Sequence, residues 1–251
     1  MEISFADRTV IVTGGAGGFG AATATAFAEA GAHVVVSDID AERAEKVASG
    51  LPSAIAVHTD VTDAQAVREL MDRTVSEYGR LDVLVNNAGM PHPLTAVVDM
   101  APADVDQQMA INFRSVVLGC KYALPKLREQ PGSSVVNVAS ISARRPRPGS
   151  TVYCATKAAV ESFTRGFAAE VAPQVRVNAV SPVISETGFV KSAFGVDELP
   201  DDTRKSMIDG IPMGRTTSVD DVANAILYLA SSKAAFLTGV CLDVDGGRSI
   251  S

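Results

Sequence analysis

Short apolar runs alternate with amphipathic segments along the chain. The apolar runs are rich in Val, Ile and Ala and predict strands, whereas the segments with apolar residues at helical spacing predict helices. The predicted strands span 9–12, 33–38, 54–58, 81–85, 134–139, 175–180 and 240–244. The predicted helices span 21–30, 41–49, 63–78, 103–127, 152–171 and 220–230.

This alternation defines an α/β fold class. Continuous apolar strands are typical of a sheet buried on both faces, and regular alternation with helices predicts βαβ crossovers. We therefore expect a doubly wound, seven-stranded parallel sheet with helices on both faces. No linker or repeat interrupts the pattern, so residues 1–251 are expected to form a single domain. The least patterned stretch, 186–213, is rich in Gly, Pro and acids, and is expected to be an irregular lid over the substrate.

Composition narrows the classes of function. The formal net charge of −7 argues against nucleic acid or an anionic membrane surface as a partner. No apolar run reaches the ~20 residues that cross a bilayer, and the N-terminus lacks the pattern of a signal peptide. The scattered cysteines Cys120, Cys154 and Cys241 have no metal-ligand spacing, so we expect no metal site and a reducing compartment. These features predict a soluble cytoplasmic protein.

A glycine-rich turn follows the first predicted strand and opens the first helix. It fits GxGxxG as Gly15, Gly17 and Gly20, and it also fits TGxxxGxG as Thr13, Gly14, Gly18 and Gly20. Glycines there let the backbone approach a pyrophosphate, which then lies on the helix N-terminus. In this strand–turn–helix context, the run predicts a Rossmann-type dinucleotide site.

Two acids follow neighbouring strands at the same predicted edge of the sheet. Asp38 can accept hydrogen bonds from the adenosine ribose hydroxyls and would repel a 2′-phosphate, which favours NAD over NADP. Arg43, the nearest base, is about a helical turn too far along the sequence to offset that charge. Asp60 could meet the adenine ring or could be only a helix N-cap, and the sequence leaves both open. Asn87-Ala88-Gly89 could pass beneath the cofactor.

Tyr153 and Lys157 are four residues apart on a predicted helix, and therefore on one face. An ammonium near a phenol lowers the phenol pKa from about 10, which gives a usable proton donor and acceptor. Ser140 ends the fifth predicted strand, thirteen positions before Tyr153. Alone, Asn112 could equally be a helix-interior residue bonded to its own backbone.

Taken together, these motifs resemble the short-chain dehydrogenase/reductase family over nearly the whole chain. The resemblance is carried by Thr13-Gly14, Gly18-Phe19-Gly20, Asn86-Asn87-Ala88-Gly89, Asn112, Ser140, Tyr153, Lys157 and the C-terminal Val244-Asp245-Gly246-Gly247. It implies an NAD(P)-dependent oxidoreductase that transfers a hydride, usually assembled as a homotetramer. It implies that Tyr153 is the general acid and base, and that Lys157 holds the nicotinamide ribose. Ser140 would hydrogen-bond the substrate oxygen, and Asn112 would kink its helix and hold a relay water.

Motif and resemblance together give the expected cofactor contacts. They are Gly14, Gly17, Gly18, Phe19, Gly20, Asp38, Ile39, Asp60, Val61, Asn87, Ala88, Gly89, Tyr153, Lys157, Pro182, Val183, Ser185 and Thr187. One position departs from the family pattern, since Val183 replaces the glycine that usually follows this proline. A β-branched residue would be strained at positive φ, so we expect extended backbone there, with Val183 crowding the nicotinamide face.

The substrate is left open by the sequence. We expect a small-molecule secondary alcohol or ketone, with a 3-oxoacyl thioester or a sugar as alternatives. A catalytically silent dinucleotide-binding protein is a further alternative, which the intact Ser140, Tyr153 and Lys157 argue against. Arg144, Arg145 and Arg147 share one short loop and could bind a substrate acid. We favour pairing with acidic surface residues of this chain or of a neighbouring subunit instead.

Overall fold

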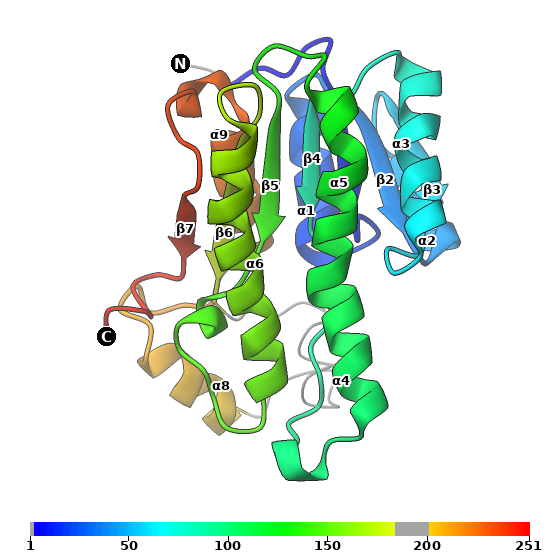
Figure 1. Cartoon of the computed structure of the whole chain (residues 1–251). Helices are drawn as coiled ribbons and strands as arrows, with labels where there is room; N and C mark the ends of the chain where they lie inside the picture. Colours follow the sequence, from blue (N-terminus) through cyan, green and yellow to red (C-terminus); the bar gives the residue numbers. More distant parts are fainter. Residues whose placement is uncertain (1–2, 184–200) are drawn as a thin grey trace.

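The computed structural model describes residues 3–183 and 201–251 and is shown in Figure 1. Within these ranges, seven strands form one sheet in the order β3-β2-β1-β4-β5-β6-β7. Each neighbouring pair is parallel. The strands are β1 (Thr9–Thr13), β2 (His33–Asp38), β3 (Ala54–His58), β4 (Val83–Asn86), β5 (Ser134–Val138), β6 (Arg176–Pro182) and β7 (Cys241–Val244). The predicted doubly wound parallel sheet is confirmed.

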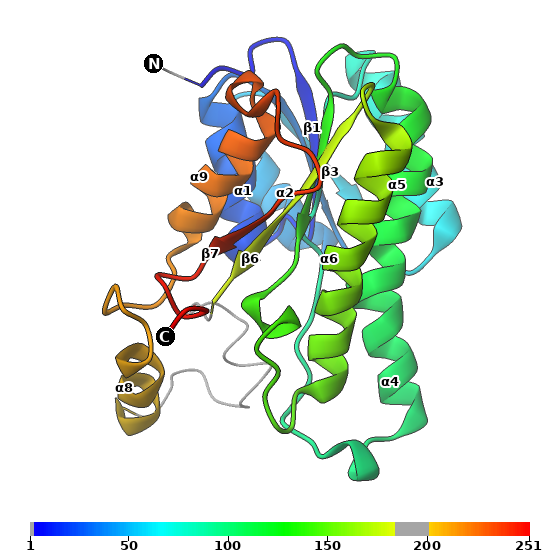
Figure 2. The same ribbon diagram turned by 60° about the vertical axis from the view of Figure 1, so that its left-hand side comes forward.

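Helices cover both faces of the sheet. The α-helices are α1 (Gly18–Glu29), α2 (Ala41–Ala48), α3 (Ala64–Tyr78), α4 (Pro102–Met109), α5 (Ser115–Leu127), α6 (Thr151–Val171), α8 (Asp201–Asp209) and α9 (Val219–Ala230). Short 3-10 turns are η1 (Val97–Asp99), η3 (Ile141–Ala143) and η4 (Ser232–Ala234). Figure 2 shows α1, α2 and α9 on one side of the sheet and α3, α5 and α6 on the other.

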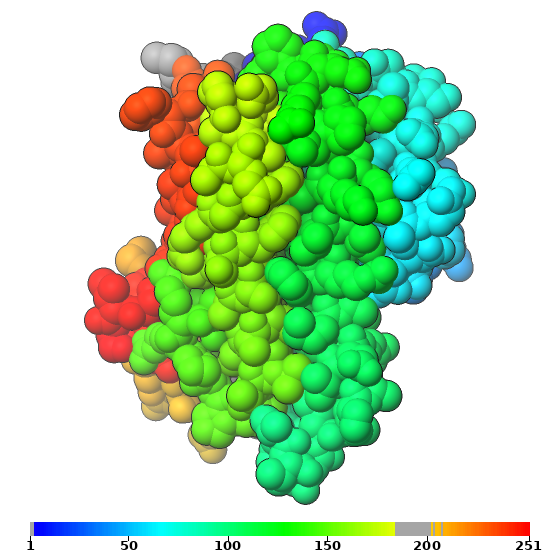
Figure 3. Space-filling view, in the orientation of Figure 1, coloured from blue at the N-terminus to red at the C-terminus, as the bar shows by residue number. Residues whose placement is uncertain are grey.

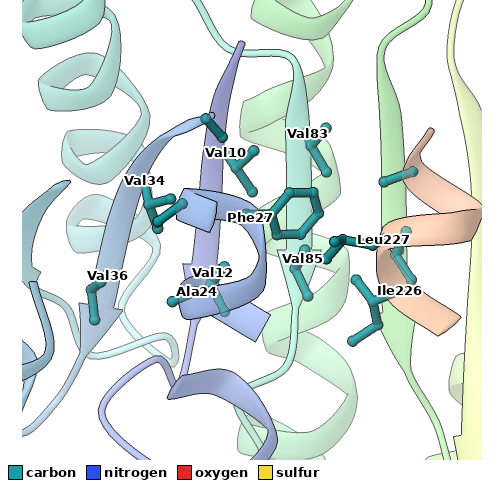
Figure 4. Close-up of a cluster of buried hydrophobic side chains, with 14 of the residues drawn as sticks. Val10, Val12, Ala24, Phe27, Val34, Val36, Val83, Val85, Ile226 and Leu227 are labelled. Carbon is teal, nitrogen blue, oxygen red and sulfur yellow. The ribbon is translucent and has the colours of Figure 1, made fainter. Parts of the chain in front are cut away.

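Alternating strand residues build two cores. Val10 and Val12 of β1 point toward α1, whereas Ile11 joins the cluster under α3, α5 and α6. Figure 4 shows Phe27 of α1 among strand valines, with Ile226 of α9 nearby. All five side chains are fully buried. Because each strand contributes to both cores, its sequence reads as a continuous apolar run rather than an alternating one.

Polar caps set where several helices begin. Asp40 accepts a hydrogen bond from the backbone of Arg43 in α2, and Asp63 accepts one from Gln65 in α3. Ser218 forms a capping box with Asp221 at the start of α9.

Two segments differ from the pattern-based prediction. The single helix expected over 103–127 is divided by η2, a π-helical turn over Ala110–Arg114 that joins α4 to α5. Such π-turns are rare single-turn insertions inside α-helices, and the apolar spacing over 103–127 predicts one continuous helix. Within 186–213, which was expected to be irregular, α8 forms over a run without Gly or Pro. Residues 186–200 of that stretch lie outside the described residues.

In the part of the chain that the structure describes, no helix is both long enough and apolar enough to cross a membrane.

Candidate active site

A cavity of about 660 Å³ runs along the carboxyl edge of the sheet. Its lining includes sixteen of the residues predicted from the sequence. They are Gly14, Gly17, Gly18, Phe19, Asp38, Ile39, Asp60, Val61, Asn87, Ala88, Gly89, Ser140, Tyr153, Lys157, Pro182 and Val183. Gly20 and Asn112 lie behind this lining. Ser185 and Thr187 lie outside the described residues.

The glycine-rich loop has the backbone that its sequence predicts. Gly14 and Gly18 have positive φ values of 63° and 53°, which side-chain-bearing residues rarely adopt. A Cβ on Gly20 would overlap the carbonyl oxygen of Gly14. Asn87 holds the loop from the neighbouring strand, because its Nδ2 donates to the carbonyl oxygens of Thr13 and Gly14, each at 2.9 Å. The loop therefore offers a side-chain-free cradle at the N-terminus of α1, which fits a pyrophosphate.

Asp38 ends β2 beside this cradle. Its Oδ2 accepts a hydrogen bond from the backbone N–H of Ala16, and its Oδ1 accepts one from Asp40, both at 3.0 Å. The carboxylate is thereby fixed at the cavity wall, with lone pairs left for ribose hydroxyls.

Arg43 corrects one expectation from the sequence. Spacing along the chain put it a turn too far from the nucleotide end, yet it lines the cavity. Its Nη2 donates to the carbonyl oxygen of Ala16 at 3.3 Å and lies against Gly17. Because α2 starts directly after β2, its first turn folds back over the glycine-rich loop. Arg43 and Asp38 both hydrogen-bond the backbone of Ala16, so the predicted ribose site has one positive and one negative side chain beside it.

Of the two interpretations of Asp60, adenine contact or helix N-cap, the structure excludes the N-cap. The N-cap of α3 is Asp63, not Asp60. The Oδ1 of Asp60 instead accepts hydrogen bonds from the N–H and hydroxyl of Thr62, at 2.8 and 2.7 Å, while the residue lines the cavity.

Ser140, Tyr153 and Lys157 converge at the other end of the cavity. Ser140 follows β5 with extended backbone, and its side chain hydrogen-bonds Tyr153. Tyr153 and Lys157 lie one turn apart on α6, with Nζ 5.9 Å from the centre of the phenol ring. The ammonium also donates to the carbonyl oxygen of Val138 at 2.9 Å.

The π-helical turn positions Asn112 beside Lys157. Its Oδ1 accepts a hydrogen bond from the N–H of Met90 at 2.8 Å. Its Nδ2 donates to the carbonyl oxygen of Met90 and to Oε1 of Gln108, each at 2.9 Å. The reading in which Asn112 bonds only its own helix backbone is therefore wrong. A Cβ on Gly89 would lie 3.1 Å from Asn112 Oδ1 and 3.3 Å from Lys157 Nζ. Both polar atoms thus border Gly89, where a side chain would displace them. Gln108, which supports Asn112, was not among the residues predicted from the sequence.

Burial dominates the titration of this site. It lowers the pKa of Lys157 from the usual 10.5 to about 8, because the desolvated ammonium loses its hydration. Burial also raises the pKa of Tyr153 to about 12, although the hydrogen bond from Ser140 opposes this. The expected lowering of the phenol pKa by Lys157 is therefore not produced by the protein alone. The ammonium donates to the carbonyl oxygen of Val138, and burial is the largest influence on the pKa of the phenol.

Val183 has an ordinary backbone. Asp7 is the one non-glycine with positive φ among the described residues, so the valine carries no left-handed strain. It is buried, lines the cavity, and packs with Ile141 and Ile211. The side chain narrows the cavity where a glycine would leave space.

The comparisons with known proteins agree with this arrangement. The profile of a family described as enoyl-(acyl carrier protein) reductase matches residues 14–249. The chain is 42% identical over 248 residues to the 4-formylbenzenesulfonate dehydrogenase of Comamonas testosteroni, covering 97% of this chain and 98% of that protein. It is 41% identical over 252 residues to the cis-4-hydroxycyclohexanecarboxylate dehydrogenase of Sinomonas cyclohexanicum, with 98% of both chains covered.

A solved structure is similar over the full fold. The 3-ketoacyl-(acyl-carrier-protein) reductase of Brucella melitensis, complexed with NADH, superposes with a TM-score of 0.92 at 38% identity, covering 98% of this chain and 100% of that one. The relatives are enzymes that act on alcohol or carbonyl groups, which agrees with the intact Ser140, Tyr153 and Lys157 and argues against a silent binding protein. The chain belongs to the short-chain dehydrogenase/reductase family and is an oxidoreductase acting on CH–OH groups.

Proposed function

We propose that the protein transfers a hydride between NAD and a secondary alcohol or the corresponding ketone. The observation that carries this proposal is one cavity with a glycine-rich cradle and Asp38 at one end and Ser140, Tyr153 and Lys157 at the other. When bound, NAD supplies the hydride-accepting ring and a positive charge that acts with Lys157 to lower the pKa of Tyr153.

The side chains at the chemical end have distinct tasks. Ser140 donates a hydrogen bond to the substrate oxygen, where charge develops as the hydride moves. Tyr153 removes the hydroxyl proton during oxidation and returns it during reduction. Lys157 holds the nicotinamide ribose, and Asn112 holds a water that passes protons to Lys157. The pKa of about 8 for Lys157 suits this exchange, because the side chain gains and loses protons near neutral pH.

At the nucleotide end, we assign the pyrophosphate to the glycine-rich loop and the ribose hydroxyls to Asp38. The carboxylate opposes a 2′-phosphate, which supports NAD over NADP. Arg43 lies close enough to offset part of that repulsion. Asp60 and Val61 are assigned to the adenine end of the cavity.

The substrate panel follows from the relatives. Two of them are named for compounds with an acid group on a six-membered ring, 4-formylbenzenesulfonate and cis-4-hydroxycyclohexanecarboxylate. A second candidate, reduction of a 3-oxoacyl thioester, is favoured by the structural similarity to a 3-ketoacyl reductase. A spectrophotometric NADH assay over cyclic hydroxy acids, neutral secondary alcohols, sugars and 3-oxoacyl thioesters tests these choices. We expect oxidation of a cyclic secondary alcohol, and faster reduction of thioesters would favour the second candidate.

Assembly and location remain part of this proposal. We expect a homotetramer formed through the helical face of α4, α5 and α6 and through the β7 edge, which has no further strand beside it in the described sheet. Figure 3 shows the first of these faces, with α5 and α6 side by side. A monomer in sedimentation velocity would contradict this assignment. We place the protein in the cytoplasm, where its three free thiols stay reduced.

We also assign a lid role to 201–213, the described part of the least patterned stretch. Ile211, just after α8, packs against Ile141 and Val183, and both of these line the cavity. The segment therefore borders the substrate end.

A further inference from the structure

The three arginines of the loop between β5 and α6 have different surroundings. Arg144 is paired with Asp243, to which Nη1 donates at 3.0 Å, and with the buried Glu161 at 3.3 Å. Arg145 donates to the backbone carbonyl oxygen of Arg248. The expected pairing with acids is confirmed for Arg144, whereas the partner of Arg145 within this chain is a backbone carbonyl.

Arg147 is the member of this group that lines the cavity. Its backbone is fixed, because its carbonyl oxygen accepts a hydrogen bond from the N–H of Ser150 at 3.1 Å. The adjoining Gly149 accepts one from Thr95 at 2.9 Å. The Arg147 side chain is half-buried, yet within residues 3–183 and 201–251 no carboxylate or carbonyl pairs with it. A half-buried cation without such a partner keeps its desolvation cost uncompensated.

The surroundings of Arg147 are positive. Its pKa is lowered, first by burial and then by the nearby cation of Arg248, with Arg145 adding a smaller effect. Among the described residues that line the cavity, the acids are Asp38 and Asp60, and both belong to the nucleotide end. Among the described residues, no carboxylate lining the substrate end offsets these cations, so an anion there would meet an attractive field.

The walls around this cation are largely apolar. Met90, Pro91, Leu94, Ile141 and Pro148 line the same part of the cavity. This combination suits a molecule with an apolar body and one charged group, because the body contacts the walls and the charge meets the guanidinium.

We propose that Arg147 binds a carboxylate or sulfonate group on the substrate, at the end remote from the alcohol carbon that faces Tyr153. This inference rests on the proposed function and gives its substrate class as an apolar hydroxy acid. The planar guanidinium can form two parallel hydrogen bonds to such an oxyanion. Arg147 is thus a specificity-determining residue.

Binding to the NADH-saturated protein tests this role without requiring turnover. Isothermal titration calorimetry compares cyclohexanecarboxylate and cyclohexanesulfonate with the neutral cyclohexanecarboxamide. We expect the two anions to bind roughly 10- to 100-fold more tightly than the amide, as for a hydrogen bond to a charged group. Arg147→Gln is expected to remove this preference, and Arg147→Lys to restore part of it.

Arg145→Gln is the matched control, because it removes the same charge from the same loop but from outside the cavity lining. It is expected to keep most of the anion preference. Equal affinities for the anions and the amide in the wild type, or an unchanged preference in Arg147→Gln protein that still binds NADH, would overturn the inference. Anion preference without any alcohol oxidation would support the Arg147 site while counting against the proposed function. Preference for only one anion identifies which acid the site takes.

Discussion

Lys157 offers a test of the site through stability rather than activity. The side chain is buried, and burial lowers its pKa from 10.5 to about 8. At pH 7 the folded protein therefore carries an ammonium that would be more favourable in the unfolded chain. Replacing Lys157 by Met keeps an unbranched side chain and removes the charge.

The size of this effect follows from the two pKa values. Each pKa unit is worth about 1.36 kcal/mol, so holding the charged form inside the fold costs about 3 kcal/mol at pH 7. The unfolded chain binds more protons than the folded one between pH 8 and 10.5, so the wild type gains stability as the pH rises through this window. By pH 10 the cost falls to about 1 kcal/mol. The lost hydrogen bond to Val138 adds a nearly constant offset that does not alter this pH dependence.

Urea unfolding at pH 7, 8, 9 and 10, followed by circular dichroism at one protein concentration, measures the difference. We expect the unfolding free energy of Lys157→Met, relative to the wild type, to fall by about 2 kcal/mol from pH 7 to pH 10. Lys46→Met removes an exposed ammonium and is the matched control, with an expected effect within about 0.5 kcal/mol throughout. A difference between Lys157→Met and the wild type that stays constant with pH would refute the reasoning about burial.

Two further predictions concern the ends of the cavity. Asp38→Asn keeps an acceptor for the glycine-rich loop but removes the charge, so the kcat/KM ratio of NADP to NAD should rise roughly 10- to 100-fold. Adding Arg43→Ala should reverse part of that gain, and an unchanged ratio in the single variant would exclude the ribose role of Asp38. Gly89→Ala puts a Cβ 3.1 Å from Asn112 Oδ1 and 3.3 Å from Lys157 Nζ, so these atoms must shift by a few tenths of an ångström, and kcat should fall roughly 10-fold. Gly166→Ala, whose added Cβ meets nothing within 4 Å, should leave kcat unchanged, and equal rates for both variants would argue that the space at Gly89 does not matter for the positions of Asn112 and Lys157.

Much of the fold was predictable because its signals are local. Each strand is a short apolar run, and each helix has apolar residues at helical spacing. The π-helical turn over Ala110–Arg114 was not predicted, because such turns are rare insertions and a continuous α-helix is the ordinary interpretation of a long amphipathic segment.

The site was predictable where function follows from residue type and order, and not where it depends on three-dimensional approach. Sequence order gave Ser140, Tyr153 and Lys157, which do converge. Sequence spacing put Arg43 too far from the nucleotide end, because it does not show that the first turn of α2 folds back over the glycine-rich loop. The sequence also could not show which of Arg144, Arg145 and Arg147 is structural. The partners of Arg144 and Arg145 are Asp243 and Arg248, about a hundred residues away along the chain. Long-range pairing alone separates the structural arginines from the one in the cavity.

The central claim is that Tyr153 carries the proton in an NAD-dependent hydride transfer. Tyr153→Phe removes the phenol hydroxyl and keeps the ring, so the nucleotide site should remain. NADH binding, followed by fluorescence titration, is expected to stay within about threefold of the wild type, while the rate of alcohol oxidation falls by roughly 10²- to 10⁴-fold. Turnover close to that of the wild type in Tyr153→Phe protein that binds NADH normally would contradict the account.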